Sequence, residues 1–287
     1  MNILLGVPSS GMISESSSKA SWLASFDHQV TRVSSCNSGP NYNACLVEAL
    51  NACEKGYYSH HAQIHADIQV VDPLEQCRDC KGTKCLTCGF TGERCYKRWL
   101  DILIEEMEKH DAAFISVPMA IKDPRGLTSC GIGNPENRWN PWRRFCTNEF
   151  AKMPTTFTAA DIGYADKYLI HNHALCVFDM RKPVWWQTKE DGAIKALFNF
   201  EERIIRDPSG RWARQQDSED WAFSRILWEL GAKTVITSRV ETLHHGAVPW
   251  PNRGEWGTWK DGDEDTASQW RESLNPQRGT EPAGAVA

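Results

Sequence analysis

The first 71 residues alternate between strand patterns and helix patterns, and this alternation constrains the fold more than any other feature. Residues 3–7 form a short apolar run that Pro8-Ser9-Ser10-Gly11 closes, which is typical of a buried parallel strand and its turn. A helical pattern, an alternating strand, an amphipathic helix ending at Gly56 and a strand carrying residues 62–67 follow. We therefore predict an α/β fold with a parallel, doubly wound sheet, and Ser9 and Asp67 at one edge of it.

Composition limits the class of protein. The chain has 287 residues, of which 41% are hydrophobic, enough for one large core or two ordinary ones. A net charge of -5 argues weakly against a dedicated nucleic-acid-binding protein, although it leaves room for a local basic surface. Neither an apolar run of about 18 residues nor a signal-peptide pattern occurs, so we expect a cytoplasmic protein without membrane contact, in the host cytoplasm if the protein is viral.

Five of the eleven cysteines fall within residues 77–95, which predicts a metal site rather than a disulfide framework. Two C-x-x-C pairs, Cys77/Cys80 and Cys85/Cys88, each present two sulfurs to one cation, and nearby glycines permit the tight turns of such a site. Four thiolates leave no open position on Zn²⁺, so its expected role is structural. The segment resembles the cysteine-rich zinc modules of DnaJ-type and anti-TRAP-type proteins, with only part of their glycine pattern. Free or redox-active thiols are the alternative.

The middle of the chain carries arginines and histidines whose sequence context leaves two interpretations. Residues 122–157 are rich in Gly, Pro, Asn and Trp, and we expect a long irregular segment in which Arg138, Arg143 and Arg144 hold phosphates beside aromatic rings. Incidental arginines of a surface loop are the alternative. The His171-Asn172-His173 triplet is attributed to the polar face of a strand rather than to a metal site.

A helix and a strand near the C-terminus carry further candidates. Ser218 is placed to cap a helix that opens with Glu219 and Asp220, and capping alone would explain both acids. The segment that follows Gly231 alternates as a strand and ends in His244-His245-Gly246.

Taken in order, the VPSSG turn before a helix, the strand ending in a D-x-D-like triplet and the S-E-D-W-A-F helix before an H-x-G strand resemble a GT-A glycosyltransferase. The resemblance is to the inverting family-two type, especially viral and bacterial stand-alone enzymes, and it covers residues 1–246 apart from the cysteine segment. It implies one catalytic domain over residues 1–271, with a mixed, mainly parallel sheet flanked by helices. Residues 77–95 would be a zinc-binding insertion within this domain, and we expect residues 272–287 to be a disordered tail.

The resemblance also implies a divalent cation that bridges the diphosphate of the donor. Asp67 matches the last carboxylate of the D-x-D motif, and His65 stands where the first Asp usually is. His244 matches the histidine of H-x-G that completes the metal site, with His245 as the alternative. Oxygen ligands favour Mn²⁺ or Mg²⁺, and an imidazole tilts the preference toward Mn²⁺.

Donor-binding and catalytic residues are implied in the same way. Asp220 matches the usual catalytic base, and Glu219 is its partner in the E-D pair. The nucleotide-sugar donor, such as a UDP-sugar, would lie against Pro8, Ser9, Ser10, Asn43, His65 and Trp256.

The resulting hypothesis is a metal-dependent glycosyltransferase that moves a sugar to an acceptor hydroxyl, with inversion. The acceptor and the oligomeric state stay open; a hydroxymethylated DNA base, as in phage DNA modification, is one acceptor the arginines and cysteines favour. A zinc-stapled nucleic-acid-binding protein without catalysis is one alternative. A nucleotidyltransferase is another, although VPSSGMISESS lacks the basic residue that a phosphate loop after the first strand would normally supply.

Overall fold

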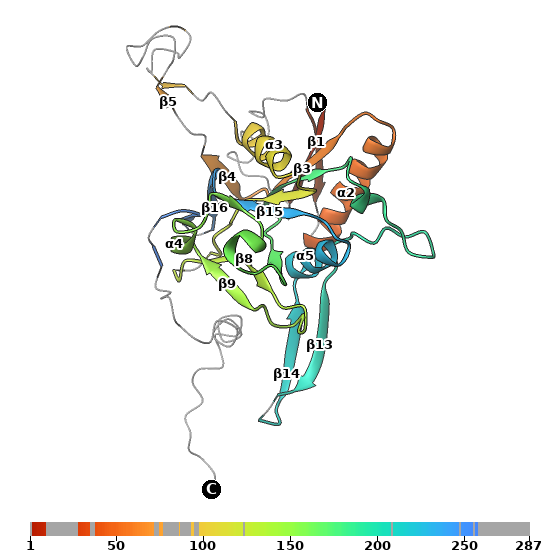
Figure 1. Ribbon diagram of the computed structural model, residues 1–287, viewed down its shortest axis with the longest axis vertical. Coiled ribbons are helices and arrows are strands. Elements are labelled where there is room, and N and C mark those ends of the chain that lie inside the picture. The colour runs from red at the N-terminus through yellow and green to blue at the C-terminus, as the bar shows by residue number, and fades with distance from the viewer. Residues whose placement is uncertain are drawn as a thin grey trace.

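A seven-stranded mixed sheet forms the centre of the protein in the computed structural model (Figure 1). The structure describes residues 2–9, 28–34, 38–71, 75–76, 86, 93–94, 98–122, 124–207, 209–246, 248–254 and 256–257. Ser10, the first expected helix and the expected tail lie outside these residues. So do the four cysteines of the expected zinc site, Cys77, Cys80, Cys85 and Cys88.

Five strands of the central sheet run in one direction and two run against them. The sheet order is β10-β15-β7-β12-β3-β1-β2, and β12 is antiparallel to both of its neighbours, as β10 is to β15. The doubly wound parallel sheet expected from the alternation is therefore a mixed α/β sheet. The strands are β1 (Ile3–Ser9), β2 (His28–Ser34), β3 (His60–Ile64), β7 (Phe114–Ser116), β10 (Thr156–Phe157), β12 (Leu175–Asp179) and β15 (Thr234–Thr237).

Helices cover both faces of this sheet because its strands are apolar on both sides. Successive strand residues alternate between two core clusters, so Ile115 and Val177 pack with α3 (Trp99–Lys109), while Phe114 and Phe178 pack with α2 (Ser38–Glu54) and α5 (Glu219–Glu229). The short helices are α4 (Thr147–Phe150), η2 (Ala160–Ile162) and η3 (Pro183–Trp186).

The segment expected to be irregular contains regular structure. β8 (Leu127–Gly133) pairs with β9 (Arg143–Cys146) and with β11 (Tyr168–Ile170) in an antiparallel three-stranded sheet. The glycines of β8 do not fit the pattern of a strand in the sequence. They are required here because neighbouring atoms leave no room for a Cβ. A Cβ at Gly131 would lie 2.3 Å from the Arg143 carbonyl oxygen, and one at Gly133 would lie 2.0 Å from the Tyr168 ring.

The strand expected after Gly231 is divided between two sheets. β15 belongs to the central sheet, whereas β16 (Glu241–His245) pairs with β4 (Ile68–Val71) and β17 (Pro249–Pro251). β13 (Glu201–Arg206) and β14 (Trp212–Asp217) form an antiparallel hairpin, and β5 (Glu75–Gln76) pairs with β6 (Glu93–Arg94). No helix in the described parts of the chain is long and apolar enough to cross a membrane.

Candidate functional site

Several chain segments end or begin at one edge of the central sheet. β1 and β3 run in parallel with Gly6 opposite Gln63, so Pro8 and Asp67 follow at the same edge. The segment after β7 leads to Lys122, and β16 follows β15. The residues before β12 reach the same edge because β12 runs the other way. Carboxyl ends of parallel strands are where α/β proteins bind ligands.

Asp67 and His244 meet at this edge although they lie far apart in the sequence. The Asp67 Oδ2 atom is 3.3 Å from His244 Nε2 and accepts a hydrogen bond from Lys122 Nζ at 2.5 Å. Pairing of β16 with β4 sets this contact by placing His244 opposite Ile68. Burial alone would raise the pKa of Asp67, but the contacts with His244 and Lys122 hold it below its usual range. Asp67 is therefore a carboxylate at neutral pH.

The backbone fixes the tautomer of His244. Its Nδ1 lies 2.8 Å from the carbonyl oxygen of Ala120, and a carbonyl can only accept, so Nδ1 carries the hydrogen. Nε2 is therefore the ring nitrogen that faces the Asp67 carboxylate, and either a proton or a cation between the two atoms makes their contact favourable. Gly246 leaves room beside them, since a Cβ there would lie 3.1 Å from Cδ of Lys122.

The side chain of His245 makes a different contact. Neighbouring residues on a strand point to opposite faces, and His245 Nε2 lies 2.9 Å from Gln69 Oε1. Of the two histidines that the sequence left as alternatives, His244 is the one that contacts Asp67.

His65 pairs with Tyr42, a residue that the sequence analysis did not select. Burial lowers the pKa of His65 to about 4, against the opposing effect of Asp67 and Asp220, and burial followed by Asp220 and Glu219 raises the pKa of Tyr42. The imidazole is thus neutral and the phenol protonated, and the Tyr42 hydroxyl is hydrogen-bonded to His65 Nε2. The two rings stack with centroids 5.1 Å apart.

Asp220 lies in the first turn of α5 and is held by residues from the segment before β12. Its Oδ1 is 2.6 Å from Nδ1 of the buried His173, and its Oδ2 accepts a longer bond of 3.4 Å from the Asn172 amide. Phe198 and Phe223 pack edge-on against the His173 ring. The His171-Asn172-His173 triplet is therefore buried between β11 and β12 rather than on the polar face of a strand. Sequence alone gave no signal for His173, because its position depends on the reversed direction of β12.

The carboxylates of Asp67 and Asp220 flank the Tyr42–His65 pair. Both act on the pKa of Tyr42 and on that of His65, so they lie within electrostatic reach of the same two rings. The edge of the sheet thus carries two carboxylates, one bonded to an ammonium and an imidazole, the other to an imidazole and an amide.

The protein ligands for a cation are few. Among the residues that the structure describes, no group of three or more His, Cys, Asp or Glu side chains could hold a metal ion. Asp67 Oδ2 and His244 Nε2 supply two, an oxygen and a nitrogen that lie 3.3 Å apart. Mg²⁺ in phosphate-transferring sites is often held by one or two carboxylates, with water and substrate phosphates supplying the rest. The donor set therefore fits a cation that is bound together with a diphosphate.

The structural zinc site expected from the sequence is not tested by the structure. Its four ligands, Cys77, Cys80, Cys85 and Cys88, lie outside the described residues, so no distance between their sulfurs tests whether they meet. The four-thiolate site therefore stays a prediction from the two C-x-x-C pairs. The cysteines that the structure does describe form no disulfide with one another; they are Cys45, Cys53, Cys130, Cys146 and Cys176.

The other residues assigned to the donor have their own contacts. Both polar atoms of the Asn43 amide bond the backbone of Phe198, at 2.7 and 2.8 Å. Trp256 packs on Trp250 and donates to the carbonyl oxygen of Pro251. Pro8 is buried at the end of β1. Asn43 therefore links α2 to the chain segment before β13, a role that the sequence did not indicate.

The three arginines of residues 122–157 make intramolecular bonds. Arg138 pairs with Glu201, Arg143 pairs with Glu149, and the buried Arg144 donates to the carbonyl oxygen of Thr128. Their expected role in holding phosphates stays a prediction.

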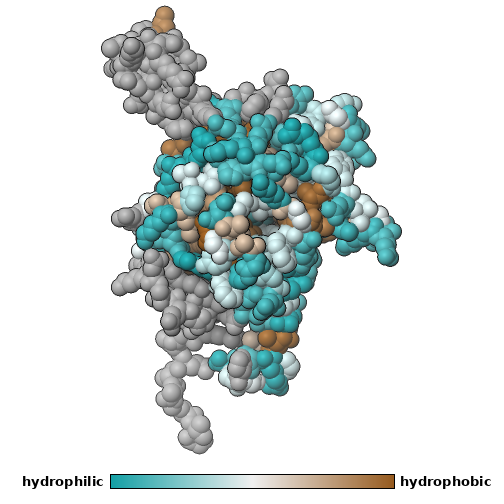
Figure 2. Space-filling model, viewed as in Figure 1, coloured by the Kyte–Doolittle hydropathy of each residue, from teal (hydrophilic) through white to brown (hydrophobic). Residues whose placement is uncertain are grey.

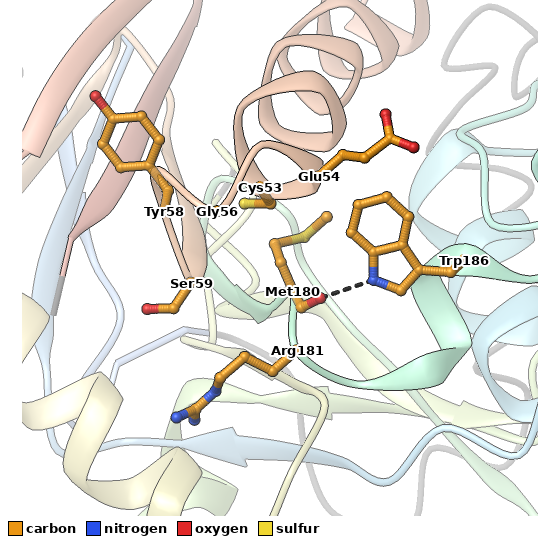
Figure 3. A pocket seen from close by; sticks show the side chains of 8 residues that line it. All are labelled: Cys53, Glu54, Gly56, Tyr58, Ser59, Met180, Arg181 and Trp186. Carbon is orange, nitrogen blue, oxygen red and sulfur yellow. Dashed lines mark hydrogen bonds between the residues drawn. The ribbon is translucent and has the colours of Figure 1, made fainter.

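An open pocket of about 450 Å³ lies at the opposite edge of the sheet, before β3 and after β12 (Figure 3). In Figure 3 the Trp186 ring and Met180 face the end of α2, and Trp186 Nε1 donates to the Met180 carbonyl oxygen at 2.9 Å. Its lining comprises Cys53, Glu54, Gly56, Tyr58, Ser59, Met180, Arg181 and Trp186. None of these belongs to the edge that carries Asp67 and Asp220.

Comparisons with known proteins give only distant structural likenesses. The sequence matches no protein-family model, and a search of curated proteins gives no match. Among solved structures, one titled "Crystal Structure of A197 from STIV" is similar with a TM-score of 0.46 and 11% sequence identity, covering 86% of each chain.

Proposed function

We propose that this protein is a metal-dependent glycosyltransferase of the GT-A type, acting at the edge that carries Asp67, His244 and Asp220. The observation that carries the proposal is the contact between Asp67 and His244, since two distant segments supply a carboxylate and an imidazole lone pair to one point. The mixed α/β sheet is compatible with this class.

Asp67 and His244 would hold the cation. A divalent cation there supplies Lewis-acid stabilisation of the negative charge that develops on a leaving diphosphate. The hydrogen bond from His244 Nδ1 to the Ala120 carbonyl orients the ring so that Nε2 stays available.

Lys122 is the nearest positive side chain to that point. Its ammonium now neutralises Asp67, and its stem extends from the segment after β7 past Gly246. If Asp67 held a cation, the Lys122 ammonium would no longer be needed to neutralise this carboxylate and would be close enough to bind a phosphate oxygen. Lys122 thereby supplies the basic residue that the turn after β1 lacks.

Asp220 is the proposed base. A carboxylate can take the proton of an acceptor hydroxyl while the hydroxyl oxygen bonds to the anomeric carbon, and the bond from that carbon to the diphosphate oxygen breaks. His173 and Asn172 fix the carboxylate through hydrogen bonds to its two oxygens. Attack opposite the leaving group inverts the anomeric centre.

The test is a thermal-shift screen of nucleotide sugars with and without Mn²⁺, followed by an assay for release of nucleoside diphosphate. We expect a donor to raise the melting temperature more with Mn²⁺ than without it, and Asp67→Asn to abolish that difference. The exposed Asp166, which pairs only with the adjacent Lys167 among described residues, is the matched control as Asp166→Asn. A protein that no nucleotide sugar stabilises in Mn²⁺ contradicts the proposal.

A nucleotidyltransferase is the second candidate, because Lys122 gives the site a basic residue close to the metal-binding carboxylate. The two reactions differ in the leaving group. Glycosyl transfer releases a nucleoside diphosphate, whereas nucleotidyl transfer releases pyrophosphate from a nucleoside triphosphate. Chromatography of the products with a sugar nucleotide or a nucleoside triphosphate as substrate separates them.

A further inference from the structure

The β13–β14 hairpin, residues 201–217, projects from the body of the protein as an arm (Figure 1). A hairpin that projects from the core buries little apolar surface, so its exposed side chains should be hydrophilic unless they bind a partner. The side chains of this arm are not simply hydrophilic. Figure 2 shows hydrophobic atoms among hydrophilic ones along it.

The outward face of the arm combines two apolar side chains with arginines. Strand alternation and the pairing of Arg206 with Trp212 and of Ile204 with Arg214 place these four residues on one face. Ile204 is 72% exposed and Trp212 is 61% exposed, and both arginines are exposed as well. The guanidinium of Arg206 lies 4.3 Å from the centre of the Trp212 ring. This face therefore presents a flat aromatic surface beside positive charge.

The charges on this face are not balanced. Its acid, Glu202, is already bonded to Arg214 at 2.5 Å. Arg206 donates to the Gly210 carbonyl oxygen and meets no carboxylate among the described residues. The uncompensated charge beside the indole is therefore positive, which suits an anionic partner.

The opposite face fixes the arm to the body. The guanidinium groups of Arg138 and Arg203 both lie over the Trp139 ring, 4.8 and 4.5 Å from its centre. Arg138 also pairs with Glu201 and with the buried Asp217, which face each other at the base of the hairpin. The arm is thus held in place before any partner arrives, which lowers the entropy cost of binding.

We propose that the outward face of this arm binds a nucleic-acid strand, with phosphates on Arg206 and Arg214 and a base stacked on Trp212. Planar rings stack on tryptophan with little dependence on sequence, and arginine bonds phosphate oxygens in a planar fork. A second copy of this chain fits less well. Two copies joined by these faces would bring like-charged arginines together, and two apolar residues per copy bury far less than the roughly 1,200 Å² of a stable interface.

The proposal does not depend on glycosyl transfer. The arm ends at Asp217, and α5 begins at Glu219 with Asp220 in its first turn. A strand bound on the arm would therefore lie on the chain segment that leads into the candidate site, whatever reaction that site performs.

The test is fluorescence anisotropy of a labelled 20-nucleotide single strand, and of the matching duplex, with the full-length protein and no sugar nucleotide. We expect the single strand to bind more tightly. Trp212→Ala should weaken binding about tenfold or more, and Arg206→Gln should weaken it and reduce the slope of log affinity against log salt by about 0.7. Glu202→Gln should strengthen binding, since it frees Arg214.

Control variants lie at the far edge of the sheet, where Trp186→Ala and Lys55→Gln remove an indole and a cation of similar kind. We expect both to bind the strand as the parent does, and circular dichroism checks that every variant is folded. Three results overturn the proposal: no binding by the parent at 100 µM protein, arm variants that bind within twofold of the parent, or arm variants that change only the oligomeric state in size-exclusion chromatography.

Discussion

Replacing Asp217 with Asn should stabilise the protein at neutral pH. The side chain is 1% exposed, and its Oδ2 is 3.5 Å from Arg138 Nε and 4.0 Å from Arg225 Nη2. Neither carboxylate oxygen has a hydrogen-bond partner among the described residues. Burial raises the pKa of Asp217 to about 6 from an ordinary value of 3.8, against the lowering effect of the two arginines.

The size and sign of the stability change follow from the difference between the folded-state pKa of Asp217 and its ordinary value. A rise of about 2 pKa units disfavours the charged form in the folded state by about 3 kcal/mol. Because the folded pKa lies above the unfolded one, the contribution of Asp217 to stability is complete below pH 3.8 and is lost as the pH rises through about 6. Asn has no carboxyl group to ionise, so the variant does not lose this contribution as the pH rises. The stability of Asp217→Asn relative to the parent should therefore increase by up to about 3 kcal/mol between pH 4 and pH 7.

Urea denaturation of parent and variant at half-unit steps from pH 4 to pH 8 measures this difference. Asp207→Asn, on the turn of the same arm, is the control, because hydrogen bonds from Ser209 lower the pKa of Asp207 and its effect has the opposite sign. A difference between Asp217→Asn and parent that stays constant over this range, or an Asn variant less stable at pH 7, refutes the reasoning.

Four further changes test the site. Asp67→Asn should remove the Mn²⁺-dependent part of donor stabilisation, as seen by thermal shift, and should also lower the metal-free melting temperature, because the charge contacts of Asp67 with Lys122 and His244 are lost. Asp220→Asn should lower the rate of sugar transfer by about 10²- to 10⁴-fold with donor binding retained. A near-normal rate would show that Asp220 only stabilises the start of α5. His173→Gln should lower the rate less and move the pH profile, because it loosens the base without removing it. Cys77→Ser combined with Cys80→Ser should lose one zinc ion per chain by elemental analysis, and a parent protein without zinc would end that hypothesis.

The ends of elements could be predicted where local chemistry marks them. A short apolar run closed by a turn marked β1, and the strand before Asp67 was placed to within a few residues. Ser218 lies at the N-cap of α5 as expected, although its side chain makes no capping hydrogen bond. The resemblance to GT-A glycosyltransferases implied that Asp67 meets His244 or His245, and the structure brings Asp67 and His244 together.

Features that depend on strand direction could not be predicted. Nothing in the apolar pattern of residues 175–179 tells a parallel strand from an antiparallel one, so His173 was assigned to an ordinary strand face. Tyr42 and Lys122 belong to a helix and a loop whose distance from Asp67 is set by packing of the whole sheet. The glycines of β8 made a strand look like a loop, because their reason is a tertiary contact.

The reversed course of β12 has a consequence for redesign of this protein. Residues inserted before Leu175 would emerge on the same surface as residues inserted after Ile64, because the two strands are antiparallel and these residues lie opposite each other. Chain added behind Asp179 would instead appear on the far side, beside the open pocket. Grafts that extend the edge carrying Asp67 and Asp220 should therefore be inserted before this strand, and a tag that must stay clear of that edge should be placed after it.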